Sequence, residues 1–240
     1  MHTARLRRVT KDEVPARFEG FADRDARFFR ALAKSQNRDW FQLHRAEYEQ
    51  GWNAPMKALL AELRERFEPL YRRQELGPPK VFRIHRDVRF SKDKAPYKTH
   101  IGGYVPIAGT GAGPGGIAVL YFHVGDGERF VGSGQYMMDA EQLARFRAAV
   151  VEERSGGALV TLLKKLERGG YEVGAYDTLQ RVPRGFDPEH PRAEILKRKG
   201  LIVTYPELPR TLLTSHALVD WLVRHAKPTA PLVEWLAAVT

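Results

Sequence analysis

The stretch KVFRIHRDVRFSKDKAPYKTH, residues 80–100, decides the fold of this chain because apolar and charged side chains alternate along it. Within residues 81–90 the even-numbered positions are mainly apolar and the odd-numbered positions are mainly polar. This alternation has the period of two of a β-strand. Residues 91–96 contain Ser, Asp and Pro, which favour a turn, and we expect a returning strand over residues 97–107. The stretch therefore predicts an antiparallel β-hairpin.

The residues on both sides of this hairpin predict a helical region and more strands. Apolar side chains recur every three or four residues between 21 and 70, so the N-terminal third is predicted to be helical. Residues 117–124 and 129–137 are rich in apolar and β-branched side chains, and we expect them to pair across the short turn at 125–127. The predicted antiparallel sheet thus has at least four strands.

The C-terminal part predicts helices with a few further strands. Asp139 is a favourable N-cap for a helix, and one or two short strands are expected within residues 171–182 and another at 201–205. Strands in the middle with helices before and after them indicate an α+β protein. We predict a single α+β domain over residues 16–240, preceded by a flexible basic arm at residues 1–15.

The composition limits the kind of protein that the chain can be. It contains no cysteine, which excludes disulfides, thiolate catalysis and cysteine-ligated metals. No stretch predicts a secretory signal or a membrane-spanning helix, so we expect a cytoplasmic protein with no membrane partner. The 39 Lys and Arg exceed the 29 Asp and Glu, a net charge of +10 that favours acidic partners. A generally arginine-rich genome is the alternative explanation for this charge.

The charge is concentrated in residues 80–100, where seven lysines and arginines accompany two aspartates and leave a net charge of +5. Five of these cations are expected to converge from the strand and the turn on one phosphate or carboxylate: Arg83, Arg89, Lys92, Lys94 and Lys98. Guanidinium groups offer bidentate contacts to such an anion, and lysines add mobile charge. A charged face that is merely solvated is the alternative.

Arg86 is expected to have a structural role instead. It lies on the apolar face of the predicted strand, so its side chain should be partly buried and needs a carboxylate partner. Asp87 lies on the opposite face and cannot be this partner. We expect an ion pair with Asp39 or Glu47 from the helical third.

The chain offers few candidates for acid–base chemistry. His44 and Glu47 lie one helical turn apart and could act as an oriented pair, and Asp87 is a third candidate base. A histidine beside a surface glutamate is the alternative interpretation of the first two. No cofactor is predicted from these residues.

Two patterns that often mark a ligand site are interpreted as structural. The glycines of residues 111–116 satisfy G-x-G-x-x-G, but they lead into the strand at 117–124 rather than into a helix, so we predict a flexible hairpin connection. His85, His100 and His123 stand on strands that could be neighbours. None of them has the close spacing of metal ligands, and we predict no metal site.

Three functions are compatible with these features. The first is binding of a phosphate-bearing ligand, either a nucleotide or a nucleic-acid backbone, with phosphoryl or phosphodiester chemistry as an extension. The second is a non-enzymatic nucleic-acid-binding module in which four aromatic side chains stack on bases beside the cations: Tyr97, Tyr104, Tyr121 and Phe122. The third is docking of an acidic protein partner on the basic turn. The compression of the cations into one strand and turn favours a pocket.

A resemblance to a known family rests on the motifs FEGF at 18–21, NRDWF at 37–41, RDVRFSKDK at 86–94 and GSG at 132–134. These motifs are similar to those of the domain of unknown function 2461, an uncharacterised family with bacterial and fungal members, and the similarity begins near residue 16. The resemblance implies a single domain, and it implies no established activity, cofactor or catalytic residue. Gln36 and His85 depart from the residues expected in the family.

Overall fold

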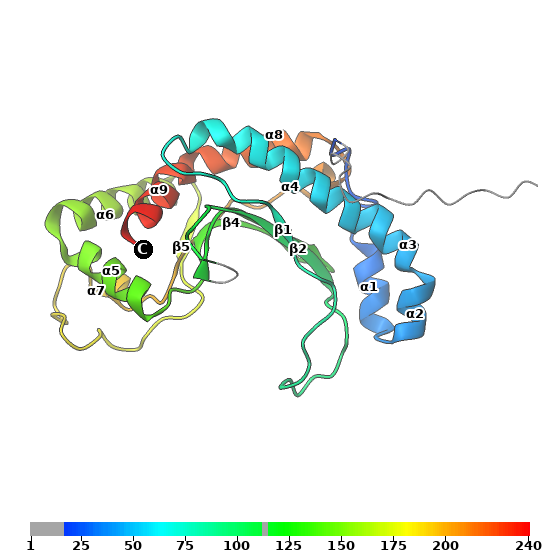
Figure 1. Cartoon of the computed structure of the whole chain (residues 1–240), viewed down its shortest axis with the longest axis horizontal. Coiled ribbons are helices and arrows are strands. Elements are labelled where there is room, and N and C mark those ends of the chain that lie inside the picture. The colour runs from blue at the N-terminus through cyan, green and yellow to red at the C-terminus, as the bar shows by residue number, and fades with distance from the viewer. Residues whose placement is uncertain (1–16, 112–114) are drawn as a thin grey trace, which may run out of the picture.

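The computed structural model describes residues 17–111 and 115–240, and its centre is a six-stranded antiparallel sheet of order β1-β2-β3-β4-β6-β5. The strands are β1 (Lys80–Val81), β2 (His100–Pro106), β3 (Ile117–Gly125), β4 (Arg129–Gln135), β5 (Glu172–Gly174) and β6 (Leu201–Thr204). Figure 1 shows the sheet as an arch with a convex and a concave side. The arm predicted at residues 1–15 lies outside the described residues, as does the middle of the glycine-rich connection, residues 112–114.

Helices precede and follow the sheet, so the predicted α+β fold is confirmed. The N-terminal third contains α1 (Arg27–Lys34), α2 (Arg38–Leu43), α3 (Arg45–Tyr48), the π-helical turn η1 (Glu49–Asn53), α4 (Ala54–Phe67) and the 3₁₀ turn η2 (Glu68–Leu70). The later helical elements are α5 (Ala140–Val151), α6 (Glu153–Arg168), α7 (Ala193–Leu196), η4 (Arg210–Thr214), α8 (Ala217–Ala226), η5 (Lys227–Thr229) and α9 (Ala230–Val239). None of the helices in the described ranges is long and apolar enough to cross a membrane.

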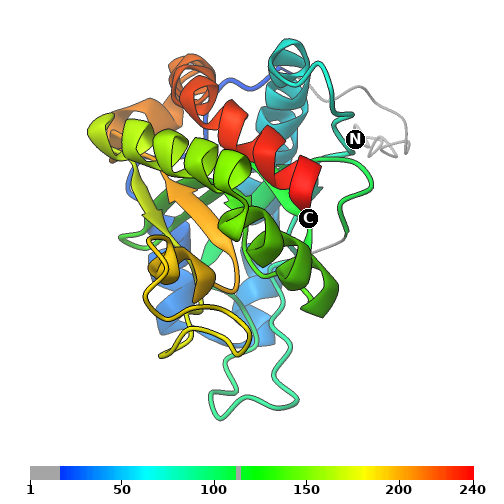
Figure 2. The same ribbon diagram turned by 90° about the vertical axis from the view of Figure 1, so that its left-hand side faces the viewer.

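The hydrophobic core lies on the convex side of the sheet, under α4, α8 and α9 (Figure 1). In register, Gly103 of β2 is paired with Phe122 of β3, so both face the same side. A Cβ on Gly103 would lie 2.6 Å from the Leu60 side chain of α4, and the fully buried Phe122 ring stacks on Phe21. Helix packing therefore covers this face. In Figure 2, α6 and α9 lie side by side and extend this layer over the sheet.

The neighbouring positions of the same strands face the concave side. Tyr104 is paired with Tyr121, and Gly102 is paired with His123. Tyr121 and His123 are only partly buried, in contrast to the fully buried Phe122 between them. Within the described residues, no helix packs against Tyr121 and His123 in the way that α4 packs against Gly103. The concave side is thus where side chains of the sheet remain available to a ligand.

The strand predicted at residues 80–90 is correct in direction but wrong in length. Regular pairing ends at Val81, and beyond it three single backbone hydrogen bonds join the two arms: Phe82 N to Gly102 O, Lys98 N to Ile84 O and Arg86 N to Pro96 O, at 2.8–2.9 Å. Pro96 has no N–H to donate, so the ladder cannot be completed there. Residues 87–95 instead form a loop that projects past the concave side in both ribbon views (Figures 1 and 2).

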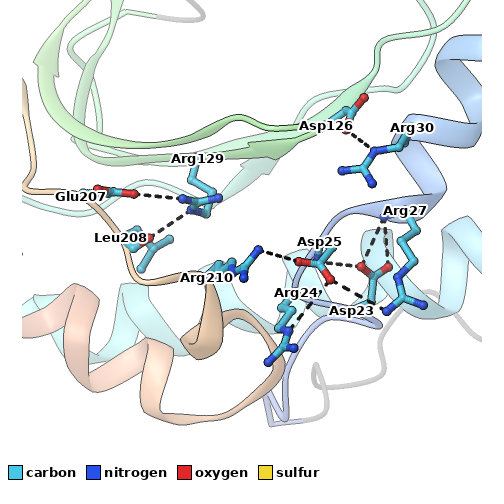
Figure 3. A network of polar contacts seen from close by, with 10 residues as sticks. All are labelled: Asp23, Arg24, Asp25, Arg27, Arg30, Asp126, Arg129, Glu207, Leu208 and Arg210. Atoms are coloured by element: carbon cyan, nitrogen blue, oxygen red, sulfur yellow. Dashed lines mark hydrogen bonds and ion pairs between the residues drawn. The ribbon is translucent and has the colours of Figure 1, made fainter.

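Ion pairs tie the N-terminal helices to one end of the sheet and to the segment before α8 (Figure 3). Arg30 of α1 donates to Asp126 in the β3–β4 turn at 2.8 Å, which raises the pKa of the guanidinium. Arg210 of η4 pairs with Asp25 at 3.2 Å. Both pairs are exposed to solvent and screened by salt, so they add little to the stability of the fold.

Candidate functional site

A cavity of about 370 Å³ lies between the N-terminal helices and the segment that follows β1. Three cations line it from three different elements: Arg45 from α3, Lys57 from α4 and Arg83 from the segment after β1. The polar lining also includes Gln42, Glu49, Asn53 and His85. We call this space the basic cavity.

The three cations of the basic cavity form no ion pair with any residue that the structure describes. Within residues 17–111 and 115–240, Arg45, Lys57 and Arg83 make no ion pair, although fifteen ion pairs form elsewhere in that part of the chain. Glu49 is the one carboxylate of the described lining, and its Oε2 accepts a hydrogen bond from Asn53 Nδ2 at 2.6 Å. The cavity therefore has three positive charges and one negative charge, and the negative one is already engaged.

The helical side of the basic cavity is built by a polar stripe with helical spacing. Gln42, Arg45, Glu49, Asn53 and Lys57 follow one another at intervals of three or four residues, while the apolar positions between them enter the core. Glu49 and Asn53 bound the π-helical turn η1. Such turns are rare and occur frequently at functional sites. This stripe is the signal in the sequence that could have identified Arg45 and Lys57.

The five cations predicted to bind one anion do not share one cavity. Arg83 is the member that lines the basic cavity. Lys98 does not line the basic cavity. Its side chain is partly buried with its Nζ 5.2 Å from the centre of the Phe82 ring, and burial together with the charge of Arg83 lowers its pKa. Arg89, Lys92 and Lys94 lie on the exposed loop at residues 87–95.

Contacts within the loop occupy two of its cations. The guanidinium of Arg89 donates to both carboxylate oxygens of Asp87 at 3.0 and 2.7 Å, which lowers the pKa of Asp87. The Lys94 ammonium donates to the Val88 carbonyl at 3.0 Å. These groups are therefore less available to a ligand than Arg83.

Arg86 forms an ion pair inside the same loop. Its guanidinium contacts Asp93 at 2.5 Å and the carbonyl of Ala95 at 3.2 Å. The Ala95 N–H and Arg86 together lower the pKa of Asp93. The partner is thus Asp93, and the expectation of Asp39 or Glu47 is wrong, because the short ladder lets the chain fold back on itself at residues 86–95.

The acid–base candidates are not brought together. His44 Nδ1 lies 2.8 Å from the Trp40 carbonyl, and its ring stacks on Trp40 at a centroid distance of 3.9 Å. Glu47 is exposed, and no hydrogen bond joins it to His44 within the described chain. Asp87 is held by Arg89. None of His44, Glu47 and Asp87 lines the basic cavity.

A second cavity, of about 310 Å³, lies on the concave face and has an aromatic lining that includes Phe82, Tyr104, Tyr121, Phe130 and Tyr136. The Tyr121 ring lies 6.2 Å from that of Phe82 and 5.7 Å from that of Phe130. Opposite Tyr121 in β4 is Gly132, whose missing side chain leaves room for these rings. We call this space the aromatic cavity.

Three of the four residues predicted to stack on bases are buried. Tyr97, Tyr104 and Phe122 are 4%, 6% and 0% exposed, and Tyr97 and Phe122 belong to the core, so the prediction is wrong for those two. Tyr104 and Tyr121 line the aromatic cavity. Alternation places Tyr121 and Phe122 on opposite faces, but it does not say which face the helices cover.

His100 and His123 lie side by side on β2 and β3, with ring centroids 4.0 Å apart. His123 Nε2 is 2.9 Å from Glu128 Oε2, and His123 Nδ1 is 3.1 Å from the Tyr121 hydroxyl. Burial lowers the pKa of both histidines, that of His100 to about 4. His85, which the sequence grouped with them, instead packs near Phe41 and lines the basic cavity.

The fold and these cavities define an α+β protein whose antiparallel sheet is covered by helices on one face and open on the other. The chain belongs to the family described as conserved hypothetical protein (DUF2461), whose model matches residues 25–235. No curated protein matches the chain.

Proposed function

We propose that this protein binds a phosphate-bearing small molecule, such as a nucleotide, in the basic cavity. The observation that carries the proposal is that three exposed cations, Arg45, Lys57 and Arg83, line one open cavity and have no ion-pair partner within the described residues. Bringing like charges together is unfavourable in the absence of a counter-charge. An anion bound between them would remove this repulsion.

The charge of the cavity matches a phosphate monoester. Three cations and the Glu49 carboxylate leave a net charge of +2, and a phosphate monoester carries about −1.5 to −2 at neutral pH. Arg45 and Arg83 offer planar guanidinium groups for bidentate contacts, and Lys57 adds a point charge. The amides of Gln42 and Asn53 are further polar groups at the same space.

The shape of the site favours a small ligand over a nucleic-acid backbone. A volume of about 370 Å³ falls within the range of about 300–1,000 Å³ that is typical of small-molecule pockets. The cations approach from three elements around one space, whereas a backbone-binding surface distributes them along a path. The proposal is one of binding, since none of His44, Glu47 and Asp87 lines the cavity.

Binding of ADP, AMP, inorganic phosphate and a single-stranded oligonucleotide, measured by isothermal titration calorimetry at two salt concentrations, tests the proposal. Arg83→Lys preserves the charge but loses the bidentate geometry, and we expect it to weaken ADP binding about tenfold, or about 1.4 kcal/mol. Arg89→Lys is the matched control, because Arg89 is held by Asp87. It should bind ADP like the wild type.

Two results would replace the proposal. Tight oligonucleotide binding with a log–log salt slope near 0.7–0.9 per phosphate, and no ADP binding, would establish a nucleic-acid-binding module instead. Absence of binding for every one of these ligands at low salt would reject the anion site and leave the acidic protein partner as the leading hypothesis.

A further inference from the structure

We propose that His100, His123 and Glu128 form a binding site for a divalent transition metal, with Zn²⁺ as the best match, on the concave face of the sheet. One potential ligand atom from each of the three side chains lies within 4.8 Å of the other two. In the described part of the chain, no other group of three histidines or carboxylates meets this condition. The site does not depend on the anion binding proposed above.

The sheet itself brings the two imidazoles together. His100 of β2 is paired with Gly125, and His123 of β3 is paired with Gly102, so the histidines are diagonal neighbours on one face. Both partners are glycines, and a Cβ on Gly125 would lie only 2.6 Å from the His100 Cβ. The absence of a side chain at this position is what lets His100 approach His123.

The ligand set suits zinc. Two histidine nitrogens and one carboxylate, with a fourth position left for water or a ligand, is a common arrangement in catalytic zinc sites. Bonds of about 2.0–2.2 Å in a tetrahedron place ligand atoms about 3.4 Å apart, so no separation within the 4.8 Å limit needs to shorten by more than about 1.4 Å. Glu128 lies in the β3–β4 turn with 66% of its side chain exposed, so its carboxylate is free to adjust its position.

A hydroxyl beside His123 favours one of its two ring nitrogens for the metal. The Tyr121 hydroxyl, 3.1 Å from His123 Nδ1, can hold that nitrogen and leave Nε2 for the metal. Outer-shell partners of this kind orient metal-bound histidines.

A simple histidine–carboxylate hydrogen bond is the competing explanation, and the protein contains one for comparison. His216 Nε2 lies 2.7 Å from Glu62 Oε1, but His216 belongs to no group of three potential ligands within the described residues. At His123 the second histidine is present. A hydrogen bond between His123 and Glu128 does not require a second imidazole, yet the His100 ring lies 4.0 Å from that of His123.

The surroundings indicate what would complete the coordination. A Zn²⁺ held by two neutral histidines and one glutamate retains one positive charge, and the Lys98 ammonium acts on both histidines. The charge of Lys98 weakens metal binding, and together with the charge left on Zn²⁺ it favours an anionic group in the fourth position. The aromatic cavity adjoins the site, because Tyr121 lines the cavity and contacts His123.

The test uses full-length protein without an affinity tag, treated with a chelator and then dialysed. Zn²⁺ is titrated in competition with a chromophoric chelator, and Co²⁺ is added separately because its visible absorption reports tetrahedral coordination. We expect one metal ion per chain. His100→Ala and His123→Ala should each weaken Zn²⁺ binding more than about 100-fold, beyond the roughly 10- to 100-fold effect of losing an outer-shell partner.

His216→Ala is the matched control, and it should bind Zn²⁺ like the wild type. Glu128→Gln alters an exposed side chain and should leave the fold intact, so its loss of affinity remains informative if a histidine variant fails to fold. Failure of the wild type to bind Zn²⁺ or Co²⁺ would overturn the proposal. So would equal affinity in the wild type and in folded variants at His100, His123 and Glu128.

Discussion

Adjacent residues of β3 should respond very differently to truncation, because Phe122 enters the core and Tyr121 lines the aromatic cavity. The Phe122 side chain is 0% exposed and its ring lies 5.8 Å from that of Phe21. Replacing such a ring by alanine removes its burial and leaves a cavity, at a cost of about 3–5 kcal/mol. For a chain of this length about 2–4 °C of melting temperature are lost per kcal/mol, so Phe122→Ala should melt about 6–20 °C lower.

Tyr121→Ala should cost much less, because part of its ring already faces solvent in the cavity and the concave face has room for water. We expect about 1–2 kcal/mol, from incomplete burial and from the contacts with Phe82 and Phe130. Urea unfolding followed by far-ultraviolet circular dichroism gives both free energies of unfolding on one scale. A loss of 3 kcal/mol or more for Tyr121→Ala, or of less than 1 kcal/mol for Phe122→Ala, would refute the assignment of the two faces.

Two further substitutions test the loop and the sheet. Arg86→Met should raise the pKa of Asp93 toward its ordinary range, because one of the two groups that stabilise the carboxylate is removed. An NMR titration of the Asp93 carboxyl in wild type and variant measures this pKa. An unchanged value would disprove the pairing. Gly134→Ala should destabilise the protein by about 2 kcal/mol or more, because Gly134 has a φ of 120° and an added Cβ would clash with the Leu201 carbonyl of β6. Chemical denaturation of this variant should show a lower midpoint, and wild-type stability would contradict the β4–β6 register.

The architecture could be predicted well because it depends on local signals. Periodicity located the helical third and the central strands, and Asp139 caps α5 through a capping box with Gln142, as its residue type suggested. The hairpin after β1 was predicted less well. Its length depends on whether each backbone group finds a partner, and Pro96 interrupts the ladder in a way that alternation does not reveal.

The candidate sites were harder to predict because they depend on contacts between distant segments. Arg83 was identified from its local charge. Arg45 and Lys57 line the same cavity, but each of them stands more than twenty residues before Arg83 in the sequence. His100 and His123 were recognised as possible neighbours. Glu128 was missed, since its place beside His123 depends on how the turn that follows β3 closes.

The location of the anion site is tested most directly by titrating ADP into ¹⁵N-labelled protein and recording ¹H–¹⁵N correlation spectra. Binding in the basic cavity predicts saturable shifts of the amides of Gln42, Arg45, Lys57 and Arg83, with the exposed loop at residues 87–95 unchanged. The same titration of Arg83→Lys should need a higher ADP concentration to reach the same shifts. Shifts confined to the loop, or no shifts at millimolar ADP, would contradict the proposed site.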